Sequence, residues 1–154
     1  MIQRIQTLYL LVVSVLMAVV LFVPIAWFAC EGGEFRLYAF ALRSFDGEVV
    51  QSAFYMGVLL VAACVLPFIT IFLFRRRLLQ IRLCVVEGVL LVGAAVMEGI
   101  YYYLACRAFA GFPFHLQGMR AVIALPVVCL VFVWLAARAI FRDELLVRAA
   151  DRIR

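Results

Sequence analysis

The chain has 154 residues, of which 69% are hydrophobic, and its formal net charge is +5. Soluble globular domains are about 45–50% apolar, so this composition excludes that class. The length leaves room for one domain, over residues 1–154.

The basic residues exclude several kinds of chemistry. All fourteen are arginines, so the sequence contains neither a phosphate-loop lysine nor a Schiff-base lysine. His115 is the only histidine, which excludes a bis-histidine haem and a histidine-rich metal site within one chain. We therefore expect no enzyme activity, no cofactor and no metal. Most arginines flank apolar segments, which favours contact with lipid headgroups and not with nucleic acid.

Four long apolar runs predict the fold, at residues 8–28, 53–74, 83–106 and 121–141. Each has about 21–24 residues, and a helix of that length can cross a hydrocarbon core of about 30 Å. A membrane span must satisfy its own backbone hydrogen bonds, which a helix does within one segment. The sequence therefore predicts an all-α protein, a four-helix transmembrane bundle in the lipid bilayer.

The arginines predict how this bundle is oriented. Cytoplasmic flanks of membrane spans carry an excess of positive charge. One side of the predicted bundle holds Arg36, Arg43, Arg107 and Arg120. The other side holds ten arginines, which are Arg4, Arg75, Arg76, Arg77, Arg82, Arg138, Arg142, Arg148, Arg152 and Arg154. We therefore predict that both termini are cytoplasmic and that the connections near residues 29–52 and 107–120 face outward.

The two outward connections have different predicted forms. In the longer one, the apolar stretch 35–40 is expected to lie on the membrane surface or on the helix ends, and Asp46-Gly47 marks a turn. The shorter one, residues 109–118, mixes phenylalanine with glycine and proline, which predicts a tight interfacial turn. Cys30 and Cys106 end their predicted helices on this side, where either a disulfide or two free thiols are possible.

Two acids within the third span are the strongest functional signal, because an ionisable residue inside a membrane span is a functional candidate by default. Glu87 and Glu98 are eleven residues apart, so they share one helix face at a separation of about 16 Å. Glu87 is predicted about one turn inside the cytoplasmic boundary, level with Arg138 and near Thr70, where an ion pair would fix the packing.

Glu98 lies deeper, and Arg120 is expected about 9 Å higher on the fourth helix. Two interpretations stay open for Glu98: a carboxyl satisfied by packing, or a proton or cation site. Beside it, Ala95 and Gly99 form a small-residue step that admits a close neighbour.

Two prolines are also expected to shape the helices. Pro67 and Pro126 interrupt the second and fourth spans and free the carbonyls of Ala63 and Val122. Such a carbonyl marks either a packing kink or, in a cavity, an ion ligand.

The tail over residues 142–154 remains compatible with a helix but becomes polar. Leu146, Ala149, Ala150 and Ile153 are spaced as an apolar stripe. We predict an amphipathic cytoplasmic extension that either lies along the inner leaflet or docks a partner. The residues proposed for docking are Asp143, Glu144, Leu146, Arg148, Asp151, Arg152 and Ile153.

The two ends, MIQRIQTLYLL and ARAIFRDELLVRAADRIR, resemble those of an uncharacterised family of small four-pass membrane proteins from Bacteroidota. The resemblance covers nearly the whole chain. It implies a bacterial inner-membrane location and an undefined function, and it implies that the ends matter. The residues of the shared pattern are Gln3, Arg4, Gln6, Asp143, Glu144, Arg148, Asp151 and Arg152.

Three functional hypotheses follow. The first is a non-enzymatic accessory or scaffold protein that engages another membrane protein, or a second copy, through its tail, its outer loop or a small-residue helix face. The alternative is a small oligomeric proton-coupled transporter in which Glu98 is the coupling residue. A membrane enzyme that acts on lipid or thiols is the weakest of the three.

Overall fold

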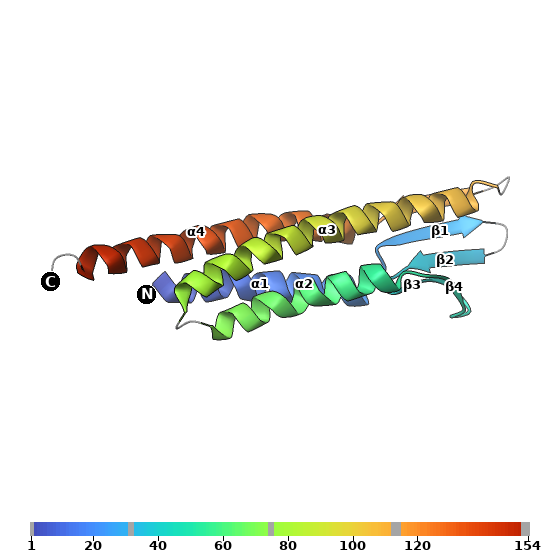
Figure 1. Cartoon of the computed structure of the whole chain (residues 1–154). Helices are drawn as coiled ribbons and strands as arrows, with labels where there is room; N and C mark the ends of the chain where they lie inside the picture. Colours follow the sequence, from blue (N-terminus) through green and yellow to red (C-terminus); the bar gives the residue numbers. More distant parts are fainter. Residues whose placement is uncertain (1, 31–32, 74–75, 112–114, 152–154) are drawn as a thin grey trace.

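Four helices form a bundle in the computed structural model, which describes residues 2–30, 33–73, 76–111 and 115–151. The main helix contacts join α1 to α2 and α4, and α3 to the same two helices. Each helix contains a stretch long and apolar enough to cross a membrane, and their number agrees with the prediction. The helices run side by side (Figure 1) and are α1 (Ile2–Phe22), α2 (Phe54–Phe72), α3 (Arg77–Phe109) and α4 (Leu125–Asp151).

The first helix ends earlier than the predicted limit at residue 28. α1 stops at Phe22, and Pro24 follows it. Proline has no backbone N–H and disfavours a helical conformation in the residue before it, so it favours the end of the helix here. The apolar run does continue, but residues 26–30 are extended.

The connections between the helices form a five-stranded sheet, so the prediction of a purely α-helical protein is wrong. All neighbouring strands are antiparallel, and their order is β4-β3-β2-β1-β5. The central pairings place Ala26 opposite Leu37 on one side and opposite Met119 on the other. The strands are β1 (Ala26–Cys30), β2 (Gly33–Leu37), β3 (Ala41–Ser44), β4 (Val49–Ser52) and β5 (His115–Met119).

Strands form in both outward connections, and this corrects the prediction for the shorter one, because residues 115–119 are a strand and not part of a tight turn. The stretch 35–40 forms the end of β2 and the link to β3. It packs on the helix ends, one of its two predicted alternatives, with Phe35 against Phe109 of α3 and Phe40 beside Gly57 of α2. Residues 112–114 lie outside the described part of the chain. The Asp46-Gly47 turn is confirmed, because Gly47 has a φ of 85° and its N–H donates to the Ser44 carbonyl at 2.9 Å.

Aromatic rings fasten the sheet to α3. Phe28 of β1 is 2% exposed, and its ring centroid lies 5.8 Å from that of Tyr102 and 5.3 Å from that of Phe109. Phe35 of β2 adds a second contact, 4.8 Å from the Phe109 ring. The 33-residue α3 extends alongside the strands (Figure 1), so the sheet and the bundle share one hydrophobic core.

The fourth helix begins with a 3₁₀ turn, η1 (Ala121–Ala124). The Val122 carbonyl accepts a hydrogen bond from the Leu125 N–H, and Pro126 lies in the first turn of α4, where a missing N–H leaves no intrahelical bond unmade. Pro126 therefore starts this helix and does not interrupt it, whereas Pro67 lies inside α2 as predicted. At its other end, α4 continues to Asp151, so the expected helical extension is present.

Candidate functional site

Glu87 lies on the buried face of α3, with 1% of its surface exposed. Its carboxylate is close enough to interact electrostatically with the thiols of Cys64 on α2, Cys84 on α3 and Cys129 on α4. Neither of its carboxyl oxygens has a hydrogen-bond partner among the described residues. Glu87 is thus a buried acid without a hydrogen-bond partner in the described ranges, and its charge reaches thiols on three helices.

The predicted ion pair between Glu87 and Arg138 is not formed. Arg138 is on the exposed face of α4, and its guanidinium carbon lies 5.3 Å from the centroid of the Trp134 ring. α3 starts at Arg77, so Glu87 lies about 15 Å from the start of this helix.

Thr70 lies in the last turn of α2 and does not hydrogen-bond to Glu87. Its hydroxyl donates to the Leu66 carbonyl at 2.8 Å, and its own carbonyl accepts from Gln80 Nε2 at 3.0 Å. Gln80 is seven residues, or about two helical turns, before Glu87. The hydrogen bond between Gln80 and Thr70 therefore joins the end of α2 to the start of α3.

Glu98 lies at the junction of the bundle and the sheet. It is fully buried, and neither carboxyl oxygen has a hydrogen-bond partner in the described part of the chain. A Cβ on Gly93 would lie 3.5 Å from Leu59 Cδ1, so these two residues face each other across α2 and α3. Five residues further along, Glu98 is level with Phe54, the first residue of α2. Arg120 is exposed and does not bond to it.

The structure tests two further expectations, one about a small-residue step and one about the cysteines. A Cβ on Gly99 would meet no atom within 4 Å, so none of the described residues packs closely against Gly99. All five cysteines are free thiols, and Cys30 and Cys106 are therefore not bonded to each other. No group of three or more histidine, cysteine or acidic residues in the described ranges is arranged to hold a metal ion.

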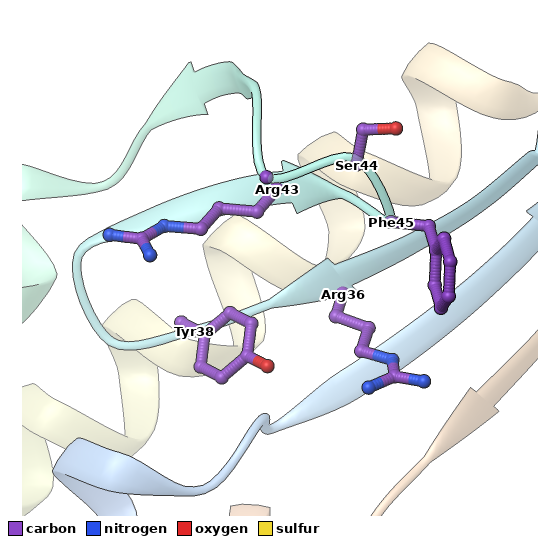
Figure 2. Close-up of a pocket in the computed structure, with 6 residues that line it drawn as sticks. Arg36, Tyr38, Arg43, Ser44 and Phe45 are labelled. Carbon is purple, nitrogen blue, oxygen red and sulfur yellow. The ribbon is translucent and has the colours of Figure 1, made fainter.

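A hollow on the sheet was not predicted from the sequence. The β2–β3 pairing sets Arg36 directly opposite Arg43, and the guanidinium of Arg43 lies 5.9 Å from the centroid of the Tyr38 ring. The hollow encloses about 210 Å³. It is lined by Arg36, Tyr38, Arg43, Ser44, Phe45 and Gly47, and Figure 2 shows the two arginine side chains pointing apart on either side of it.

Charge and exposure make this hollow unusual. Like charges directly opposite each other destabilise a strand pair. The ion pair from Arg36 Nη2 to Glu34 Oε2, at 3.5 Å between side chains that are 41% and 61% exposed, compensates little of that cost. Phe45 is 73% exposed at the rim. In the sequence, Arg36 and Arg43 are spaced on either side of a tight turn, which could have suggested a pair. Only the strand register shows that they lie opposite each other.

The predicted docking residues of the tail are partly described. Asp143 and Glu144 are half-buried, and Leu146 is 59% exposed. Arg148 and Asp151 lie within α4, but their side chains are not described, and Arg152 and Ile153 lie outside the described residues.

Comparison with known proteins identifies the family. No curated protein matches this sequence. A family model described as a domain of unknown function, DUF4293, matches residues 2–153. The match covers nearly the whole chain, in agreement with the uncharacterised family that the terminal sequences resemble. The chain therefore belongs to the DUF4293 family.

Proposed function

We propose that this protein is a non-enzymatic accessory or scaffold subunit of a larger complex in a bacterial inner membrane, and that its sheet binds another protein. The outer surface of the bundle supports the membrane location. Only 28–33% of the residues in each apolar span are buried, and the exposed ones include Leu8, Val58 and Val89. Apolar surfaces of this extent are rare on soluble monomers, whereas lipid chains solvate them.

The arginines support the orientation. The start of α1, the α2–α3 connection and the end of α4 lie at one end of the bundle, and the sheet lies at the other (Figure 1). Ten of the fourteen arginines belong in sequence to the first end. By the positive-inside rule, this end faces the cytoplasm in our proposal, and the sheet faces outward.

The hollow on the sheet is the observation that favours a protein partner. Its volume of about 210 Å³ is below the range of about 300–1,000 Å³ that is usual for small-molecule sites. Arginine and tyrosine, both present here, are enriched among the residues that dominate protein interfaces. A segment that places acidic groups against Arg36 and Arg43 and an apolar side chain against Phe45 would neutralise the two arginines and bury the exposed ring.

The test is co-purification of the full-length chain from native membranes after mild cross-linking. We expect a stoichiometric partner with the unaltered chain, and recovery reduced about tenfold or more in the double variant Arg36→Gln/Arg43→Gln, because interface arginines often contribute more than 1 kcal/mol each. The matched control is Arg107→Gln/Arg120→Gln, which removes the same charge from the same end. Equal recovery in both double variants, or no stoichiometric partner at all, would contradict the proposal.

Glu98 favours a second candidate, a proton-coupled transporter. A buried carboxyl without an internal partner is costly, and such groups mark proton pathways in membrane proteins. In reconstituted vesicles, transport would appear as a proton flux that Glu98→Gln abolishes while insertion stays normal. The scaffold proposal predicts no flux in either protein and unchanged partner recovery in Glu98→Gln.

A further inference from the structure

A groove between α1 and α4 lies at the end of the bundle away from the sheet. Its volume is about 450 Å³. Five of its lining residues form a single stripe along α4, and two lie one turn apart on α1. The lining residues described are Ile5, Tyr9, Leu135, Arg138, Ala139, Arg142 and Leu146.

The helix register gives the depth of this groove. Cys129 and Cys64 lie close enough to Glu87 for its charge to act on their thiols, and Cys64 is near the middle of α2. These residues therefore mark the centre of the bundle. Arg138 is nine residues further along α4, or about 14 Å from that centre. Half of a hydrocarbon core is about 15 Å, so Arg138 reaches the membrane boundary and Arg142 lies one turn beyond it.

The lining has the chemistry of a phospholipid. Leu135, Tyr9 and Ile5 provide an apolar wall, and the two guanidinium groups of Arg138 and Arg142 lie one turn apart on the same helix face. Arginine binds phosphate through paired N–H donors. Basic grooves between helices at the cytoplasmic boundary recognise anionic headgroups.

The neighbouring charges leave the arginines available. Arg138 stacks over Trp134, which is 58% exposed on α4, and neither guanidinium forms an ion pair with a side chain in the described ranges. The two acids of the same turn, Asp143 and Glu144, are not among the described residues that line the groove. Because the groove combines positive charge with apolar length, we infer that it selectively binds an anionic phospholipid, with the phosphate at Arg138 and Arg142 and an acyl chain along Tyr9 and Leu135.

This inference rests on the proposed membrane location but goes beyond the proposed scaffold function. Lipid binding in the groove can be measured by the fluorescence of a native tryptophan. Trp27 and Trp134 are the two tryptophans, so Trp27→Phe leaves Trp134 beside the groove as the single fluorophore. The full chain is reconstituted into phosphatidylcholine vesicles that contain equal fractions of either brominated phosphatidylglycerol or brominated phosphatidylcholine. Quenching of Trp134 then gives the relative association constant of the two lipids.

We expect phosphatidylglycerol to associate about tenfold more strongly than phosphatidylcholine, because two arginines at the membrane surface attract an anionic headgroup. Arg142→Gln should lower this preference, Arg138→Gln/Arg142→Gln should abolish it, and Arg142→Lys should retain most of it. Quenching by brominated phosphatidylcholine should be the same in every variant, which shows that the bundle is folded and inserted. Inorganic phosphate in the buffer should leave the preference unchanged, and displacement by phosphate would instead indicate a site for the free anion.

The matched control is Arg76→Gln/Arg82→Gln, which removes two exposed arginines from the same end but outside the groove. An equal loss of preference in this control would mean that overall surface charge attracts the lipid, and would overturn the site. Equal quenching by both lipids in the unaltered chain would overturn it as well. Quenching by neither lipid would contradict the membrane location itself, so that the two failures are distinguishable.

Discussion

The bundle and the sheet distribute their side chains in opposite ways. In the bundle, Glu87 and Glu98 are buried while Val65 and many similar residues are exposed. In the sheet, Phe28 is buried while Arg43 is exposed. The distribution in the bundle is the one expected of a protein in lipid, whereas the sheet exposes charged as well as apolar side chains.

The β3–β4 hairpin exposes apolar residues although it lies outside the apolar spans. In the proposed membrane location, lipid covers the exposed apolar residues of the bundle. It does not account for Phe45, Val49 and Val50, which are 73%, 58% and 55% exposed on the β3–β4 hairpin. β4 is also an edge strand, and exposed apolar edges are usually covered in native proteins. The hairpin is therefore the part of the sheet that a partner is most expected to cover.

The largest effect should come from separating the two regions. Phe28→Ala removes the ring that contacts Tyr102 and Phe109, and we expect a loss of about 3–5 kcal/mol in the stability of the sheet. Thermal unfolding in detergent should show the sheet melting before the helices. The control is Phe45→Ala, which removes an exposed ring and should change stability by no more than about 0.5 kcal/mol. Equal effects of the two variants would show that the sheet does not rest on α3.

An arginine introduced into each region tests whether lipid surrounds the bundle and water surrounds the sheet. Val65 is 46% exposed beside Cys64, near the middle of α2, and Val50 is 55% exposed on β4. An arginine at the centre of a membrane helix costs about 2.5–3.5 kcal/mol, whereas an exposed position in water costs about 0.5 kcal/mol or less. The fraction of chain that resists alkaline extraction from membranes should fall for Val65→Arg and remain unchanged for Val50→Arg. The reverse result would assign the wrong solvent to each region.

The sequence predicts the bundle far better than the sheet. Apolar length alone locates four helices, because the bilayer sets a minimum span. Apolar length alone does not reveal β1, because Trp27 and Phe28 continue the apolar run beyond Pro24. Pro24 is the local signal that the helix ends. The pairing of β1 with β5 joins residues about ninety positions apart, which no local pattern encodes.

The candidate site divides in the same way. Periodicity places Glu87 and Glu98 on one buried face, because the angle between them depends only on helix geometry. Their partners depend on how the neighbouring helices are rotated, which the sequence does not give. The predicted ion pair of Glu87 with Arg138 was therefore wrong. The opposition of Arg36 and Arg43 depends on hairpin register, and becomes visible only when the strands are paired.

The buried acids of the bundle should be destabilising. Glu87→Leu replaces two unpaired carboxyl oxygens by an apolar group, and we expect stability to rise by about 1–3 kcal/mol, measured by thermal unfolding in detergent. The same substitution at Glu48, which is exposed on the sheet side, is the control and should have little effect. A marked loss of stability in Glu87→Leu would mean that this carboxyl has a partner in the membrane.

The smallest effect belongs to the helix hairpin. Gln80→Leu removes the bond from Nε2 to the Thr70 carbonyl and should cost about 0.5–1.5 kcal/mol. Gln117→Leu, at an exposed position of β5, is the matched change in the sheet. Unfolding temperatures that fall equally for both would show that the Gln80 bond contributes nothing.

The contrast between the two regions is tested most directly by the two native tryptophans. Trp27 is on β1 and Trp134 is on α4, and they are 39% and 58% exposed. In single-tryptophan variants reconstituted into vesicles, bromine atoms placed deep on lipid chains should quench Trp134 and spare Trp27, while iodide in the buffer should do the opposite. Quenching of Trp134 by iodide but not by brominated chains would contradict the membrane-embedded bundle.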